Sequence, residues 1–133
     1  MRGPFAELEM ALVHERDIAD VATRVLLADG HANRHAGARY VLTGPEALTQ
    51  AEQARRIGAA IGRPVRYEEV PPDVARERMV RSGVPAAFVE TNLRFQAGLI
   101  GLPTEVSPAI QQVTGRPART FDEWAAEHAA DFR

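Results

Sequence analysis

The chain has 133 residues, 45% of them hydrophobic, which is enough for one domain with a modest core. A net charge of −2 and a pI near 6.1 exclude the basic footprint of a nucleic-acid-binding protein. The lack of cysteine excludes disulfides and thiolate catalysis, and all 16 basic residues are arginine. Catalysis by a lysine, whose pKa proteins can lower, is therefore excluded as well.

No targeting segment is predicted at the start of the chain. Residues 1–17 have no uninterrupted apolar core after their first basic residue, so they do not resemble a signal peptide. No later run approaches the length of a membrane span. We therefore expect a soluble, cytoplasmic protein, folded as a single domain over residues 1–133, with no membrane or nucleic-acid partner.

The first third predicts a strand, a helix and a loop. Leu8–Val13 is apolar enough for a short strand. An amphipathic helix follows, with Asp17 as its expected N-cap and Gly30 near its end. Its apolar positions repeat at helical spacing at Ile18, Val21, Ala22, Val25 and Leu26. Residues 31–38 are small and polar, which is typical of a loop.

The middle third predicts a strand–helix–strand unit. Arg39–Thr43 has the β-branched and aromatic content of a strand and stops at a Gly-Pro turn. Thr49 and Glu52 match a capping box, and Gly62 is expected to end the helix that this box opens. Val65–Val70 alternates with a period of two, as a half-buried strand does.

The last part of the sequence predicts mainly helices. Pro72–Ser82 forms one helix before Gly83, and a longer helix begins after Pro85. A short helix is expected near Ala109–Val113. Thr120 and Glu123 repeat the capping-box spacing and open a terminal helix that buries Phe121 and Trp124.

These elements predict an α/β fold with two or three short strands among about five helices. The strands Arg39–Thr43 and Val65–Val70 have few partners within the chain. Because exposed strand edges are usually covered, we expect a homodimer to complete the sheet.

Three segments carry a resemblance to a known family: VHERDIADVATRVLL, RYVLTGPEALTQAEQARRIGAAIGRPVRYEEVP and VTGRPARTFDEWAAEHAADF. In this order and spacing they resemble the C-terminal, substrate-binding half of NmrA-like atypical short-chain dehydrogenase/reductases. The resemblance implies a truncated Rossmann-type fold. It also implies that the family's glycine-rich dinucleotide loop and Tyr-x-x-x-Lys pair belong to an N-terminal half.

Neither of those two motifs occurs in this sequence. Gly98 and Gly101 have part of the glycine spacing, but position 104 is threonine and no strand precedes them. Both tyrosines, Tyr40 and Tyr67, lack a lysine four residues later. We therefore expect no bound cofactor, and a self-contained nicotinamide-dependent oxidoreductase is excluded.

The densest polar cluster comprises His14, Glu15, Arg16 and Asp17, at a predicted strand-to-helix junction. A histidine beside carboxylates can act as a general acid or base near neutral pH. In this hypothesis His14 is the proton shuttle, Asp17 orients it, and Glu15 and Arg16 contact substrate. In the alternative, Asp17 only caps the helix, and His14 or Arg16 pairs with a neighbouring carboxylate.

The helix after Pro85 supplies the other candidate site residues, and the resemblance places it over the substrate. Glu90 is a candidate catalytic residue. Asn92 and Arg94 are candidate substrate contacts, and Phe88 and Phe95 could line an apolar pocket. The alternatives are an exposed Glu90–Arg94 helix pair and ordinary core packing of the two phenylalanines.

A metal site is not predicted. His31 and His35 have ligand-like spacing, but they lie in a predicted loop and have no evident third ligand. Arg63 and Arg66 flank Pro64 and are interpreted as a solvated surface, with an anion site as the less favoured alternative.

Three hypotheses follow for function. The first is a standalone protein that binds an apolar, oxygenated metabolite and carries out cofactor-independent acid/base chemistry, such as cyclisation, isomerisation or elimination. The second is a non-catalytic ligand-binding or regulatory module. The third is a fragment or subunit of a split NAD(P)H-dependent oxidoreductase, whose Rossmann half is a separate partner chain.

Overall fold

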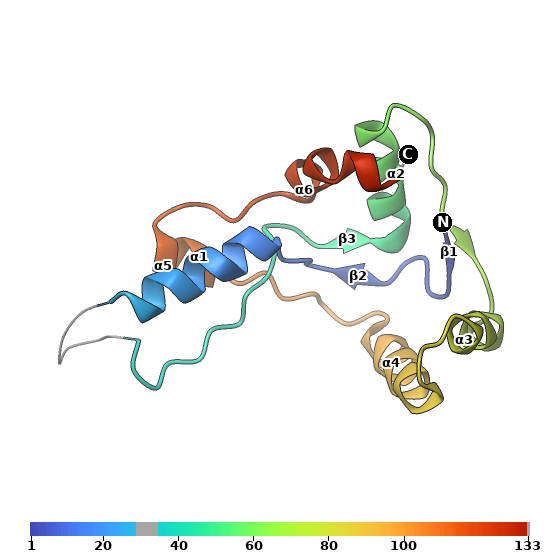
Figure 1. The fold of residues 1–133 in the computed structure, drawn as a ribbon. Helices are drawn as coiled ribbons and strands as arrows, with labels where there is room; N and C mark the ends of the chain where they lie inside the picture. The colour runs from blue at the N-terminus through green and yellow to red at the C-terminus, as the bar shows by residue number, and fades with distance from the viewer. Residues whose placement is uncertain (29–34, 133) are drawn as a thin grey trace.

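The structure is a computed structural model that describes residues 1–28 and 35–132 (Figure 1). The described residues form six α-helices, in line with the expectation of about five, and a short 3₁₀ helix. The helices are α1 (Glu15–Leu26), α2 (Gln50–Ala60), α3 (Pro72–Arg81), α4 (Ala86–Leu99), α5 (Ala109–Thr114) and α6 (Phe121–Glu127), and the 3₁₀ helix is Ala129–Phe132. No described helix has both the length and the apolar composition needed to span a membrane.

The strands are shorter than the sequence predicts. β1 (Arg2–Gly3) pairs in parallel with β4 (Glu68–Glu69), and β2 (Glu9–Met10) pairs antiparallel with β3 (Leu48–Thr49). The strands expected over Leu8–Val13 and Val65–Val70 therefore exist only as β2 and β4, two residues each. Each described sheet has two strands, so each strand has a partner on one side only.

The strand predicted at Arg39–Thr43 is absent, and this prediction was wrong. The segment is not assigned to any strand, and among the described residues no backbone group of residues 39–43 has a hydrogen-bond partner. Its side chains nevertheless alternate as in a strand. Tyr40 and Leu42 pack inward, whereas Val41 is 59% exposed. The residue types favour a strand, but strand formation requires a neighbouring strand.

Both predicted capping boxes are confirmed. The Thr49 hydroxyl accepts a hydrogen bond from the Glu52 amide at 3.1 Å, and the Glu52 carboxylate accepts one from the Thr49 amide at 2.9 Å. The Thr120–Glu123 box at the start of α6 has the same reciprocal pattern. Gly62 follows the last turn of α2 with φ of 71°, as expected for a helix-ending glycine.

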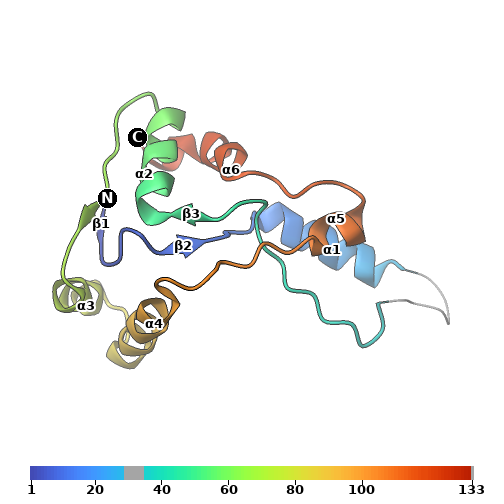
Figure 2. The ribbon, with the colours of Figure 1, turned by 180° about the vertical axis from the view of Figure 1, so that it is seen from behind.

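Two clusters of buried side chains make up part of the hydrophobic core, and Leu8, Val89 and Leu93 are buried outside them. One joins α2 and α6 through Leu48, Ile57, Phe121 and Ala125, with Trp124 and Phe132 packed against it. The other joins α1 and α5 through Val21, Ile110 and Val113, with Tyr40 and Leu42 at its margin. Figures 1 and 2 show α1 and α5 at one end of the molecule, α2 and α6 at another, and α3 with α4 at a third.

Candidate functional site

His14, not Asp17, caps helix α1. The His14 backbone is extended, and its Nδ1 accepts a hydrogen bond from the Arg16 amide at 3.2 Å. The prediction that Asp17 is the N-cap was therefore wrong, because Asp17 lies inside the first turn of the helix. Since Nδ1 is the acceptor of an amide proton, the neutral ring of His14 carries its own proton on Nε2.

The Nε2 atom of His14 is buried without a hydrogen-bond partner among the described residues. The residue is 2% exposed, and Oε2 of Glu127 lies 3.6 Å from this atom, beyond hydrogen-bond distance. Oε2 of Glu15 lies 3.4 Å from Nδ1 on the other side of the ring. A buried, unsatisfied polar atom is uncommon and often marks a functional position.

A second histidine joins the same cluster from the end of α6. His128 Nε2 lies 2.9 Å from Glu15 Oε1, and its Nδ1 lies 3.1 Å from Asp131 Oδ2. These carboxylates, Glu15 first, raise the pKa of His128 above its ordinary 6.5. The same hydrogen bond to His128 is the main cause that lowers the pKa of Glu15. Arg16 extends the cluster by a 3.1 Å ion pair with Glu127.

His14 also lines a small cleft of about 200 Å³ between the start of α1 and α6. The other lining residues are Leu12, Val13, Thr120, Phe121 and Trp124. The cleft is mainly apolar and aromatic, with the imidazole and the Thr120 hydroxyl as its polar side chains. Such a lining suits a small apolar molecule that carries a hydrogen-bond acceptor.

Asp17 is positioned by Arg119 and not by His14. Its carboxylate accepts a hydrogen bond from the Arg119 amide at 2.7 Å and a second, very short one from the Arg119 guanidinium. The Asp17 side chain is 3% exposed, and both hydrogen bonds that its carboxylate accepts among the described residues come from Arg119. The structure gives Asp17 a structural role in joining α1 to the segment before α6. The expected role of Asp17 as the orienting partner of His14 is not supported by this geometry.

The candidate residues on α4 lie mainly on its exposed face, whereas Val89 and Leu93 form its buried face. Glu90 forms a short ion pair with Arg76 of α3, so the predicted Glu90–Arg94 pair was wrong. Phe88 and Phe95 are each 64% exposed, which contradicts the expectation that they pack in the core. Asn92 is half-buried, and its side chain makes no hydrogen bond among the described residues.

The predicted residues therefore fall into two separate places. α4 packs against α3, whereas α1 packs against α5. Figures 1 and 2 show α4 well away from the start of α1 in both views. The cleft at His14 is lined by no residue of α4.

Metal binding is not indicated by the described part of the chain. Residues 1–28 and 35–132 contain no group of three or more His, Asp or Glu side chains arranged to hold a metal ion. Nδ1 of His35 lies 2.6 Å from the Tyr40 hydroxyl. His31 lies outside the described residues.

Several residues of the His14 cluster were missed by the sequence reasoning. Glu127, His128 and Arg119 come from the last fifth of the chain and meet α1 only through the fold. Trp124 was predicted to lie in the core, and it does pack against the cluster of α2 and α6. It also lines the cleft, and its ring lies 4.9 Å from the His128 ring.

Comparison with known proteins finds reductases. The chain is 37% identical over 135 residues to the (4-alkanoyl-5-oxo-2,5-dihydrofuran-3-yl)methyl phosphate reductase of Streptomyces griseus, covering 99% of this chain and 45% of the relative. It is 38% identical to the NAD(P)H azoreductase of Xenophilus azovorans, covering 97% of this chain and 44% of that enzyme. The chain thus spans less than half the length of these relatives. No family model matches it.

Solved structures share the fold. The NADPH-dependent quinone oxidoreductase of Escherichia coli, complexed with NADPH, superposes with a TM-score of 0.74 at 22% identity, covering 96% of this chain and 44% of that protein. The Citrobacter triphenylmethane reductase complexed with NADP(H) has a TM-score of 0.70 at 23% identity, covering 96% of this chain and 43% of that protein.

The fold is that of about half of a Rossmann-like α/β protein, as found in solved reductase and epimerase structures. The sequence relatives include reductases, among them an NAD(P)H azoreductase, and the chain spans less than half of each. This agrees with the predicted resemblance to the C-terminal half of an NmrA-like reductase.

Proposed function

We propose that this chain forms the substrate side of an NAD(P)H-dependent reductase and acts with a dinucleotide-binding part, on the same polypeptide or on another. The observation that supports this most is the unpaired backbone of residues 39–43. Its backbone groups have no described partner, yet its side chains alternate between core and surface as in a paired strand. An unpaired edge of this kind accepts another strand.

Exposed apolar residues at the end of α1, a helix that shares a core cluster with Tyr40 and Leu42, support the same proposal. Leu26 and Leu27, at the end of α1, are 82% and 72% exposed, and Val41 lies on the edge itself. Isolated exposed apolar side chains are ordinary, but here Leu26 and Leu27 adjoin in sequence and Val41 belongs to the unpaired segment. The added strand would belong to the sheet of the dinucleotide-binding part.

The described residues do not fit a dinucleotide by themselves. A pyrophosphate binds to free amides at a helix N-terminus after a glycine-rich turn. In this chain the side chains of His14, Thr49 and Thr120 already accept first-turn amide protons of α1, α2 and α6. α3 and α4 begin at prolines without a preceding glycine-rich loop. The proposal therefore assigns the nicotinamide cofactor to the other part.

A chimera tests this proposal. This chain would replace the matched 44% of the Xenophilus azovorans azoreductase, and binding of NADPH would be measured by calorimetry. We expect the chimera to bind NADPH and to oxidise it with an azo dye, whereas the chain alone binds none. Tight NADPH binding by the chain alone would contradict the proposal. A folded chimera that does not oxidise NADPH would contradict it too.

A second candidate function is cofactor-independent acid/base catalysis on an apolar, oxygenated metabolite. The buried, unpartnered Nε2 of His14 beside an aromatic cleft favours it. In this case His14 would donate or accept the proton, with Glu127 Oε2 at 3.6 Å to stabilise the protonated ring.

The test uses an enolisable aryl ketone in D₂O, with exchange of its α-protons followed by NMR. The chain should accelerate this exchange, and His14→Gln should remove the acceleration while Glu90→Gln on α4 retains it. Equal rates with and without the wild-type chain would sink this second candidate.

A further inference from the structure

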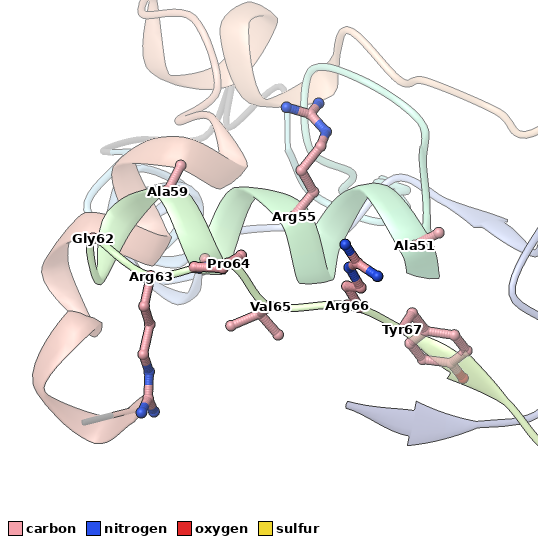
Figure 3. Close-up of a pocket in the computed structure, with 10 residues that line it drawn as sticks. Ala51, Arg55, Ala59, Gly62, Arg63, Pro64, Val65, Arg66 and Tyr67 are labelled. Atoms are coloured by element: carbon pink, nitrogen blue, oxygen red, sulfur yellow. The ribbon is translucent and has the colours of Figure 1, made fainter.

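A shallow groove of about 700 Å³ lies between α2 and the extended segment that follows it. Its apolar floor and walls come from α2 and from the segment around Pro64 and Val65 (Figure 3). The lining residues are Ala51, Arg55, Gly58, Ala59, Gly62, Arg63, Pro64, Val65, Arg66 and Tyr67. This volume is in the range of small-molecule sites, whereas the cleft at His14 is several times smaller.

The groove is positively charged although the whole chain is negatively charged. Three of its ten lining residues are arginines, and none is acidic. Arg63 is engaged with the Phe132 carbonyl at 2.7 Å, and Figure 3 shows its side chain pointing away from the helix. Arg55 and Arg66 make no ion pair or hydrogen bond through their guanidinium groups among the described residues. Two cationic groups are therefore left for an external partner.

The groove is preformed by close packing. A Cβ at Gly58 would lie 2.7 Å from the Val65 amide nitrogen and 2.8 Å from the Arg63 carbonyl oxygen, so only glycine lets the helix approach this segment. The Tyr67 hydroxyl lies 2.8 Å from the Pro4 carbonyl oxygen and 2.7 Å from Gln50 Oε1, which fixes the ring at the other end of the groove. A ligand would not have to order these walls when it binds.

We propose that this groove binds a small anion, a phosphate monoester or a carboxylate, attached to an apolar body. Arg55 and Arg66 hold the anionic group, and Ala59, Pro64 and Val65 contact the body. A guanidinium matches either anion through paired N–H donors. The groove shares no lining residue with the cleft at His14, so this binding is independent of the proposed reductase role.

Titration of the full chain with phenyl phosphate, benzoate and inorganic phosphate tests the site, with calorimetry for affinity and NMR of the arginine Nε–H groups for position. Phenyl phosphate or benzoate should shift the signals of Arg55 and Arg66. Arg66→Gln should weaken binding about tenfold, as expected for one charged hydrogen bond. Arg81→Gln removes an exposed arginine on α3 that has no ion pair among the described residues and does not line the groove, and it should leave the affinity unchanged.

A variant that fills the groove tests the contact with the apolar body separately from the contact with the anionic group. Ala59→Leu, at an exposed position on α2, should weaken phenyl phosphate more than inorganic phosphate. Binding of only one aryl anion identifies the anionic group, and binding of both still supports the proposal. Three results would overturn it: no binding of either aryl anion, an equal loss in Arg81→Gln, or inorganic phosphate binding as tightly as phenyl phosphate.

Discussion

Asp17 is a buried carboxylate whose polar partner lies 102 residues away along the chain. Because it accepts two hydrogen bonds from Arg119, we expect Asp17→Ala to lower the free energy of unfolding by about 2–3 kcal/mol, the usual range for bonds to a buried charge. Urea denaturation measures this. Asp20→Ala is the matched control. Asp20 also pairs with Arg119, but it is more exposed, so its loss should be clearly smaller.

Trp124 is the only tryptophan and reports on His128, whose ring lies 4.9 Å away. A protonated imidazole quenches a neighbouring indole, so the fluorescence should rise as His128 loses its proton. Because the pKa of His128 is raised, first by Glu15, the midpoint should lie above 6.5. Glu15→Gln should move the midpoint down towards 6.5, and His128→Gln should abolish the transition. A wild-type midpoint at or below 6.5 would refute the assigned contact.

The same pair gives stability a defined pH dependence. The contribution of His128 is complete below its unfolded pKa and is lost as pH rises through its higher folded pKa. The contribution of Glu15, whose pKa is lowered from 4.5, is present above that value and is lost as pH falls through its folded pKa. The contact therefore stabilises the protein most in the mildly acidic range, between these two titrations.

Helices α2 and α6 each begin at a capping box. Thr49→Ala and Thr120→Ala should each destabilise the protein by about 1 kcal/mol, because the substitution leaves first-turn amide groups without an acceptor. Thermal unfolding followed by circular dichroism measures the loss. Thr91→Ala on α4 is the control, since the Thr91 hydroxyl donates only to the Ala87 carbonyl within its own helix. A loss at Thr91 as large as at Thr49 would contradict the capping argument.

The helices could be predicted from sequence because their signals are local. The boxes at Thr49 and Thr120 place a helix start without reference to distant residues. Strands could not be predicted in the same way. Arg39–Thr43 has suitable residues, but pairing depends on a partner strand that the described chain does not provide.

The candidate site could be predicted only in part. His14 was predicted as a site residue because a histidine beside carboxylates can act as a general acid or base, and it does lie buried at a cleft. Its cap role and its contacts with Glu127 were missed, since they depend on backbone geometry and on residues more than 100 positions away. Phe88 was misassigned because its helical spacing matches that of a core residue, although the face on which it lies is uncovered.

At the scale of the whole molecule, substitutions of the exposed residues Leu26 and Leu27 can separate an effect on folding from an effect on assembly. Replacing both by glutamate should change the stability of the isolated chain by less than about 0.5 kcal/mol per site, because neither side chain is packed. In the azoreductase chimera the same replacements should prevent proper docking and lower NADPH-dependent turnover. Unchanged turnover in that chimera would show that these residues do not contact the dinucleotide-binding part.

The two separate core clusters have a consequence for the order in which the protein folds. α2 and α6 each begin at a capping box and pack together around Ile57 and Phe121. We therefore expect the amides of this region to be protected from exchange even without the dinucleotide-binding part. The amides of residues 39–43 have no described acceptor and should exchange with solvent rapidly in the isolated chain. Hydrogen exchange would then show strong protection around Ile57 and Phe121. Residues 39–43 would stay unprotected until a strand of the dinucleotide-binding part pairs with them.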